Sequence, residues 1–243
     1  MTEFFRRYWR RLNLERADTN QYWEIAVQNA GFYSDMKPLI AKYTRGRLLD
    51  LGAGRLTWRT MLKQYASSYT SSDLSMEHRD IDVLCDVTRP LPFADGCFDS
   101  VFCCSVLEHV TDPGSAFAEI ARVLKQDGLA IISVPFLFYL HGQPHDYYRY
   151  TRYGLLHLSH TAGLELVELI KQGGLFQLLF NIPSVLISTL AFALRLEFLI
   201  WISTRALTQL ARALDSGLDM DGLFATNHIV VLRKNRLTPI TRH

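Results

Sequence analysis

The run Leu48-Leu49-Asp50-Leu51-Gly52-Ala53-Gly54 constrains the fold of this 243-residue chain more than any other feature. Its apolar residues predict a buried strand, and a helical pattern begins soon afterwards at Arg59. Two glycines between a strand and a helix let the backbone approach a ligand closely, and the start of the helix adds hydrogen-bond donors. Asp73 ends a second strand-like run nineteen residues beyond Gly54, where an acid can hold the hydroxyls of a ribose. The run therefore predicts a cofactor site at the end of a strand.

Alternating strand and helix patterns extend this prediction to a fold class. The strand-like runs are Arg47–Leu51, Ser68–Ser72, Val83–Asp86, Ser100–Cys104, Leu129–Val134, Glu165–Ile170 and Asn227–Leu232. Helical patterns lie between them, most clearly over Gly114–Leu124 and Tyr153–Ala162. Because repeated βαβ units form parallel sheets covered on both faces, we expect an α/β protein with a Rossmann-like, mostly parallel, seven-stranded sheet and helices on both faces.

Two segments stand outside this alternation. Residues 1–45 predict an N-terminal helical cap, and residues 46–243 contain the α/β domain. An apolar helical insertion over residues 172–216 precedes the last strand, and its first 23 residues, Gln172–Leu194, carry no charge.

The insertion is long enough to raise the question of a membrane, since about 20 apolar residues span a bilayer. A single crossing would leave the last strand on the far side from the rest of the sheet. We therefore expect a helical hairpin that lies in the membrane interface or covers the substrate opening, with a homodimer interface as the alternative. The arginines and aromatic residues of Phe4–Leu12 would suit the same membrane surface.

Composition excludes several classes of function. The chain has 26 Lys and Arg against 24 Asp and Glu, which argues against a dedicated nucleic-acid binder. Its four cysteines lie close together without ligand spacing, so we expect reduced, buried thiols, and nowhere do His, Cys and acidic residues gather in a way that predicts a metal. Arginines interrupt the apolar residues of the N-terminus, which predicts no secretory signal and a cytoplasmic protein, with the inner face of the membrane as a further option.

Five motifs follow one another between residues 49 and 128. They are Leu49–Gly54, Ser72–Ser75, Leu91–Val101, Val106–Val110 and Glu119–Gly128. In this order and spacing they resemble class I S-adenosylmethionine-dependent methyltransferases, of the small-molecule type with LPF…FD…LEH motifs. The resemblance covers residues 46–136 closely and residues 137–243 loosely.

The resemblance implies that S-adenosylmethionine is the cofactor. Gly52 and Gly54 would lie under its methionine part, and Asp50 would order its ammonium group. Asp73 would bind the ribose hydroxyls, and Asp86 the adenine amino group. The implied cofactor-binding set is Asp50, Gly52, Ala53, Gly54, Asp73, Leu74, Asp86, Val87, Cys104 and Ser105, the last two facing the sulfonium.

Two positions qualify this assignment. Many members of the family have a third glycine where this chain has Leu56, so we expect a wider turn into the helix and leave the contacts of Arg55 and Leu56 open. Glu108 and His109, in the fourth motif, are expected to begin and brace a helix rather than to take part in the chemistry.

Histidines and tyrosines gather in His141–Thr151, after the fifth predicted strand, where substrate groups usually lie in this fold. His145 is the expected general base, because histidine is the usual residue for this role, with Asp146 or His141 as its orienter or as an alternative base. The competing interpretation is that these side chains only hold the loop together. The pattern Pro144–Thr151, followed by Gly154-Leu155, resembles methyltransferases associated with glycan biosynthesis.

We therefore expect an enzyme that transfers a methyl group from S-adenosylmethionine to an oxygen atom of a small-molecule or lipid-linked acceptor. The resemblance to enzymes associated with glycan biosynthesis favours a sugar as this acceptor. Two alternatives stay open. One is a quinone- or lipid-directed methyltransferase, which the apolar insertion would serve. The other is a catalytically silent cofactor-binding partner of a membrane enzyme.

Overall fold

The computed structural model describes residues 2–17, 19–75, 80–218 and 221–235. Contacts divide the chain into two compact units. The helical unit combines Met1–Lys37 with Lys171–Thr226, and the sheet unit combines Pro38–Ile170 with Asn227–His243.

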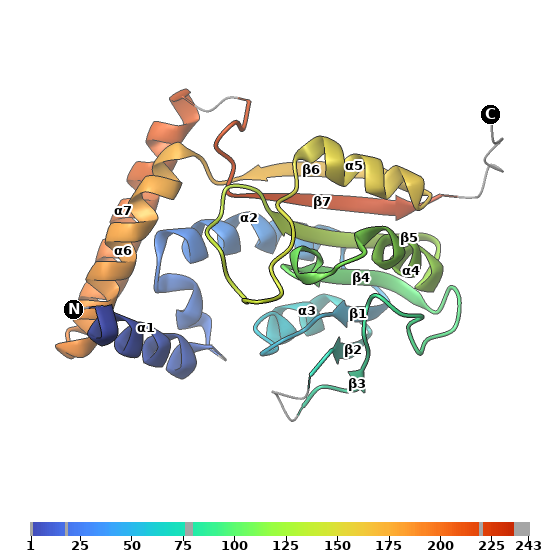
Figure 1. Ribbon diagram of the computed structural model, residues 1–243, viewed down its shortest axis with the longest axis horizontal. Coiled ribbons are helices and arrows are strands. Elements are labelled where there is room, and N and C mark those ends of the chain that lie inside the picture. The colour runs from blue at the N-terminus through green and yellow to red at the C-terminus, as the bar shows by residue number, and fades with distance from the viewer. Residues whose placement is uncertain (1, 18, 76–79, 219–220, 236–243) are drawn as a thin grey trace. The chain divides into compact units, whose positions relative to one another are not determined.

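The sheet unit is built on seven strands in the order β3-β2-β1-β4-β5-β7-β6. The strands are β1 (Arg47–Leu51), β2 (Ser68–Asp73), β3 (Val83–Leu84), β4 (Phe98–Cys104), β5 (Leu124–Pro135), β6 (Leu164–Gln172) and β7 (Asn227–Lys234). Strands β1 to β5 are parallel to one another, and β7 runs antiparallel to β5 (Figure 1). The predicted seven-stranded, mostly parallel α/β fold is confirmed.

Helices connect these strands as the alternating pattern predicts. They are α3 (Arg59–Tyr65), the short 3-10 turn η2 (Leu107–His109), α4 (Pro113–Val123) and α5 (Arg152–Thr161). The Asp112 side chain caps α4 by accepting a hydrogen bond from Ser115 N, and Pro113 occupies the first turn, where no N–H is needed. Thr151 caps α5 in the same way through Gly154 N. Local sequence therefore sets where both helices begin.

The core of the sheet unit lies between the strands and α4. Phe117 and Ile120 of α4 are fully buried and join Val101 of β4 and Ile132 of β5 in one apolar cluster. Burial of each such side chain contributes about 1.5–3 kcal/mol of hydrophobic free energy, so this cluster fixes α4 on the sheet.

The order of the strands reverses between β1 and β4, because the chain moves from β1 outward to β3 and then returns to pair β4 with β1. In open α/β sheets, ligands bind beyond the carboxyl ends of the strands at such a switch point. The glycines after β1 and the residues after β4 both lie at this edge.

The helical unit is formed by segments from both ends of the sequence. It contains α1 (Thr2–Arg16), the 3-10 turn η1 (Asn20–Glu24), the first part of α2 (Val27–Tyr43), α6 (Leu175–Ala193) and α7 (Glu197–Leu218). The N-terminal segment and the insertion were expected as separate elements, yet α1 packs on α6, and Leu12, Ile25, Phe192 and Ile200 share one cluster. The helices α6 and α7 run alongside each other as a hairpin (Figure 1).

Two element boundaries differ from the prediction in a way that matters for the site. The third strand ends at Leu84 rather than at Asp86. Asp86 instead accepts hydrogen bonds from both N and Oγ1 of Thr88, which turns the chain out of the sheet. Glu108 and His109 do not begin a helix, since they form a single 3-10 turn and α4 starts later, at Pro113.

Candidate functional site

Hydrogen bonds join the glycine turn after β1 to the end of β2. Gly52 N donates a hydrogen bond of 2.8 Å to Ser72 O, and Gly54 N donates one of 2.8 Å to Oδ2 of Asp73. Both glycines have a positive φ, +74° and +52°, a conformation that favours glycine. A Cβ at Gly52 would lie 2.3 Å from Cγ2 of Val106, whereas one at Gly54 would meet nothing within 4 Å. The turn is therefore packed on one side at Gly52 and open at Gly54.

The third-glycine position keeps a glycine-like backbone although a leucine occupies it. Leu56 has φ +58°, and its N–H donates to Ala53 O at 2.8 Å. The left-handed conformation costs a leucine roughly 1–2 kcal/mol, which burial of its side chain can offset. Helix α3 then begins at Arg59, where the helical pattern of the sequence begins.

Asp73 is oriented by the backbone on both sides. Its Oδ2 accepts from Gly54 N at 2.8 Å and its Oδ1 accepts from Ser75 N at 3.1 Å. Leu74, which lies between Asp73 and Ser75 in the sequence, has an exposed side chain. The carboxylate predicted to bind a ribose therefore lies directly beside the glycine turn.

Asp50 is buried in the middle of this edge. Its Oδ2 accepts a 2.7 Å hydrogen bond from the hydroxyl of Tyr69. Burial raises the pKa of Asp50 to about 7, because desolvation disfavours its charge, and Asp73 adds to the rise while the Tyr69 bond opposes it. A cationic group bound nearby would favour the ionised form.

The remaining predicted cofactor residues lie at the ends of β3 and β4. Hydrogen bonds from Thr88 lower the pKa of Asp86, and Val87 beside it is buried. Burial raises the pKa of Cys104 to about 12, so its thiol stays protonated and unreactive. Ser105 has φ +55° and donates from its N–H to Ser133 O, which bends the chain at the end of β4.

These residues fit the donor and acceptor needs of S-adenosylmethionine. Gly54 offers open backbone, Asp73 and Asp86 offer carboxylates for a diol and an amino group, and Asp50 offers a buried acid for an ammonium. When bound, S-adenosylmethionine supplies a methyl carbon that its sulfonium activates for transfer.

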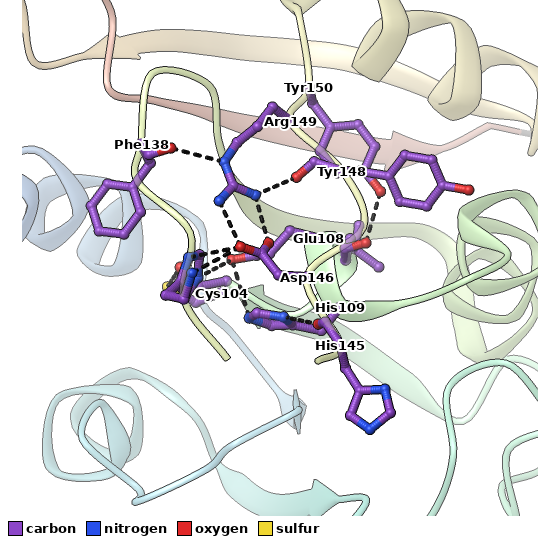
Figure 2. A network of polar contacts seen from close by, with 12 residues as sticks. Cys104, Glu108, His109, Phe138, His145, Asp146, Tyr148, Arg149 and Tyr150 are labelled. Atoms are coloured by element: carbon purple, nitrogen blue, oxygen red, sulfur yellow. Dashed lines mark hydrogen bonds and ion pairs between the residues drawn. The ribbon is translucent and has the colours of Figure 1, made fainter. Parts of the chain in front are cut away.

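The segment after β5 is held by an ion pair within the loop. The guanidinium of Arg149 binds both carboxylate oxygens of Asp146, at 2.6 Å and 2.8 Å (Figure 2). It also donates to the carbonyl of Tyr139. Asp146 further accepts from His141 N at 2.8 Å. Arg149 lowers the pKa of Asp146 well below its usual range, so this carboxyl does not carry a proton at neutral pH.

His145 and His141, both predicted near the chemistry, have different surroundings. The His145 ring is exposed, with Nδ1 at 2.9 Å from the hydroxyl of Tyr147, and it points away from Asp146 (Figure 2). Asp146 therefore orients His141 and the loop rather than the His145 ring. The neighbouring Glu108 carboxylate raises the pKa of His141.

Glu108 is the residue at this site that sequence reasoning missed. Its side chain is fully buried, and neither carboxylate oxygen has a hydrogen-bond partner among the described residues. His141 Nε2 lies 3.4 Å from its Oε1, and His109 Nε2 lies 3.9 Å from it. Its main-chain carbonyl accepts from Tyr147 N and Tyr148 N, so the fourth motif and the loop form one structure. The adjacent Glu-His pair was visible in the sequence, but the approach of His141 was not.

Comparison with known proteins agrees with the fold and with a methyltransferase domain. A family model described as a methyltransferase domain matches residues 49–132, from β1 into β5. A demethylmenaquinone methyltransferase of Corynebacterium urealyticum is 31% identical over 93 residues, which make up 36% of this chain and 40% of that protein. The chain spans less than half the length of the curated relatives it matches.

Solved structures share the fold at low sequence identity. The cyclase SpnF is 20% identical with a TM-score of 0.57, over 86% of this chain and 82% of SpnF. A phosphoethanolamine N-methyltransferase of Haemonchus contortus, solved in complex with S-adenosyl-L-methionine, is 16% identical with a TM-score of 0.52, over 92% of this chain and 59% of that one. At such identities the likeness concerns the fold alone. Residues 49–132 therefore match a methyltransferase domain, and the chain shares its overall fold with these solved structures.

Proposed function

We propose that this protein transfers a methyl group from S-adenosylmethionine to an oxygen atom of a small-molecule or lipid-linked acceptor. The observation that carries the proposal is the bond from Gly54 N to Asp73 Oδ2. It joins two predicted cofactor elements at the ends of β1 and β2, and β1 is one of the two strands at the switch point. In the reaction the acceptor oxygen bonds to the methyl carbon as the carbon–sulfur bond breaks. The sulfur keeps that electron pair as a neutral thioether.

His145 is the proposed acceptor of the hydroxyl proton. Its ring is exposed at the carboxyl edge of the sheet, and its Nδ1 is already engaged by the Tyr147 hydroxyl, which leaves Nε2 available. Neither Asp146 nor Cys104 suits this role, because the first has a lowered pKa and the second a raised one.

Attachment to a lipid surface through the helical unit supports a lipid-linked acceptor. Helix α6 has its polar and apolar sides reversed relative to a helix of an ordinary globular protein. Gln177, Asn181, Ser184 and Ser188 are buried, at positions that share one face. The opposite face exposes the apolar side chains of Leu179, Ile182, Leu186 and Leu190.

The buried polar face of α6 has partners in α2. Ser184 Oγ accepts from Val27 N at 3.1 Å, and Asn181 Oδ1 accepts from Gln28 N at 3.2 Å, so α6 side chains cap the start of α2. These bonds fix which side of α6 faces inward. The exposed apolar face is thus a consequence of specific hydrogen bonds.

The neighbouring helices also expose apolar and cationic side chains. Helix α7 exposes Phe198, Trp201 and Ile202, while Thr204, Thr208 and Ala211 are buried. Small and hydroxyl-bearing residues at a seam with large apolar residues outside are typical of helix pairs in lipid. Arg6, Arg7 and Arg10 are exposed on α1, which packs on α6, and cations of this kind are attracted to anionic headgroups.

The hairpin geometry favours an interfacial position over a crossing. Among the described residues, one helix, α6, is long enough and apolar enough to cross a membrane. However, Thr226 N donates to Gln172 O at 2.8 Å, so the insertion begins and ends at one point. An amphipathic hairpin lying on the bilayer satisfies both observations.

A quinone- or lipid-directed acceptor is the second candidate. The similarity to the demethylmenaquinone methyltransferase and the exposed apolar hairpin favour it. The third candidate is a catalytically silent partner of a membrane enzyme. Activity on a water-soluble sugar acceptor would exclude the lipid-directed candidate, whereas cofactor binding without turnover on sugar, lipid and quinone acceptors would favour the third.

Calorimetric titration with S-adenosylmethionine tests the proposed function. We expect micromolar binding that Asp73→Ala weakens at least tenfold, because a charged hydrogen-bond acceptor contributes about 1.5–3 kcal/mol. Asp80→Ala is the matched control, since Asp80 is an exposed carboxylate paired with Arg59 at 3.0 Å. Equal affinity in wild type and Asp73→Ala would show that the cofactor lies elsewhere.

A further inference from the structure

Three metal-ligating side chains converge at the end of β4. Glu108, His109 and His141 each offer one ligand atom, and these atoms lie within 4.8 Å of one another. We propose that they form a binding site for a divalent transition-metal ion. All three belong to the sheet unit.

The buried carboxylate of Glu108 is the first argument. Burying an ionised carboxyl without a compensating partner is strongly unfavourable, and buried charges in proteins are paired or coordinate metals. Glu108 is fully buried, and within the described part of the chain neither oxygen accepts a hydrogen bond. The Nε2 nitrogens of His141 and His109 lie 3.4 Å and 3.9 Å from its Oε1.

The second argument is the orientation of the two imidazole rings. His109 Nδ1 contacts the main-chain carbonyl of His145, and His141 Nδ1 lies 3.3 Å from that of Tyr139. A proton on each Nδ1 satisfies these carbonyls and leaves an unprotonated Nε2 on each ring, within 3.9 Å of Glu108 Oε1. Histidines that bind metals are held in this way, with the second nitrogen donating to a carbonyl or carboxylate.

The loop that supplies these carbonyls is itself fixed. Arg149 donates to the Tyr139 carbonyl at 2.9 Å and forms the double ion pair with Asp146. Asp146 in turn accepts a hydrogen bond from the main-chain N of His141. The arrangement therefore holds His141 in place before any ion binds, as a preorganised metal site requires.

The ligand set selects the class of ion. Two imidazole nitrogens and one carboxylate oxygen suit Zn²⁺ and its first-row neighbours, whereas Mg²⁺ and Ca²⁺ prefer oxygen ligands throughout. Three protein ligands leave at least one coordination position for water or a substrate oxygen.

The cluster is adjacent to the proposed cofactor site. Glu108 follows two residues after Val106, whose side chain packs against Gly52 in the glycine turn. An ion here would polarise an acceptor hydroxyl and assist loss of its proton. That role rests on the proposed function, but the metal site itself does not.

Metal binding is measured directly, without an activity assay. Protein treated with a chelator and desalted is titrated with Zn²⁺ under competition from a colorimetric chelator, and with Co²⁺ by visible absorption. We expect one equivalent of either ion, and at least tenfold weaker binding in Glu108→Gln, His109→Gln and His141→Gln. His157→Gln and His160→Gln, at exposed positions on α5, are the matched controls and should bind as wild type does.

Circular dichroism and S-adenosylmethionine titration of each variant separate loss of the site from loss of the fold. His141 is only half-buried, so His141→Gln should fold even if Glu108→Gln does not. A folded wild type that binds S-adenosylmethionine but no stoichiometric metal would overturn the proposal and leave a buried ion pair of Glu108 with protonated His141. Equal metal affinity in wild type and His141→Gln would overturn it as well.

Discussion

The backbone N–H of Gly54 donates a 2.8 Å hydrogen bond to Oδ2 of Asp73. Strands β1 and β2 are parallel neighbours, with Leu51 opposite Ser72, so the residues that follow each strand meet at one edge. Ser75 N holds the other oxygen of Asp73. The carboxylate is therefore oriented before a ligand arrives, and such preorganisation lowers the entropy lost on binding.

The glycine turn predicts a difference between two similar substitutions. Gly52→Ala should destabilise the fold by about 1–3 kcal/mol and weaken cofactor binding, because the new methyl group would overlap Val106 and take a left-handed backbone. Gly54→Ala imposes the same kind of backbone strain with open space around Cβ, so it should cost only about 1 kcal/mol. Urea denaturation and calorimetry measure both effects.

Val106→Ala provides the internal check on this prediction. In the double variant with Gly52→Ala, the overlap is relieved, and part of the lost stability and affinity should return. Additive losses in the double variant would mean that strain of the backbone, and not contact with Val106, is the whole effect.

Asp50 predicts an unusual dependence of stability on pH. Its pKa rises from 3.8 to about 7 on folding, so the folded protein retains a proton that the unfolded chain has released between these values. Stability should therefore fall as pH rises from about 4 to about 7, by up to about 4 kcal/mol at about 1.4 kcal/mol per pKa unit. Asp50→Asn keeps an acceptor for Tyr69 but does not ionise, and it should be more stable than wild type at pH 8.

Denaturation of wild type and Asp50→Asn at pH 5 and pH 8 measures this difference. Cofactor affinity should move in the opposite direction, because the ionised carboxylate attracts the ammonium of S-adenosylmethionine. We expect wild-type affinity to increase between pH 6 and pH 8 and the variant to bind weakly throughout. The same pH slope of stability in both proteins would show that Asp50 is ionised across the whole range.

The parts of the site predictable from sequence are those whose residues are close together in the chain. Gly52, Gly54 and Asp73 belong to successive strand ends, and a parallel sheet brings successive strand ends to one edge whatever the rest of the chain does. Their residue types also follow from local needs, such as the positive φ of both glycines. The fold class followed for the same reason, from the alternation of local patterns.

What the sequence could not show depends on long-range contacts. The spacing of residues along the sequence predicts no metal site. The loop after β5 brings His141 within 3.4 Å of Glu108, and the proposed metal site depends on this long-range contact. Composition likewise showed that α6 is apolar but not that Asn181 and Ser184 would be its buried side. That orientation is set by their bonds to α2, which belongs to a distant part of the chain.

His145 and Asp146 are neighbours with different predicted roles. His145→Ala should lower turnover by about 10²–10⁴-fold and leave cofactor affinity unchanged, as expected for loss of a general base. Asp146→Asn should instead reduce stability by about 3 kcal/mol, because it leaves the partly buried Arg149 without its ion pair. Steady-state kinetics and thermal denaturation of both variants test this division, and unchanged turnover in His145→Ala with an identified acceptor would remove it as the base.

The exposed face of α6 predicts binding to anionic vesicles. Ile182→Glu and Leu186→Glu place a charge at side chains that are 68% and 46% exposed, so they should fold normally and reduce co-sedimentation with vesicles of anionic phospholipid at least tenfold. Leu166→Glu, at an equally exposed position on β6 in the sheet unit, is the control and should leave binding unchanged. Light scattering in the absence of lipid addresses the competing dimer. If wild type is a stable dimer that ignores vesicles and Leu186→Glu makes it monomeric, a second copy of the chain, and not a bilayer, covers this face.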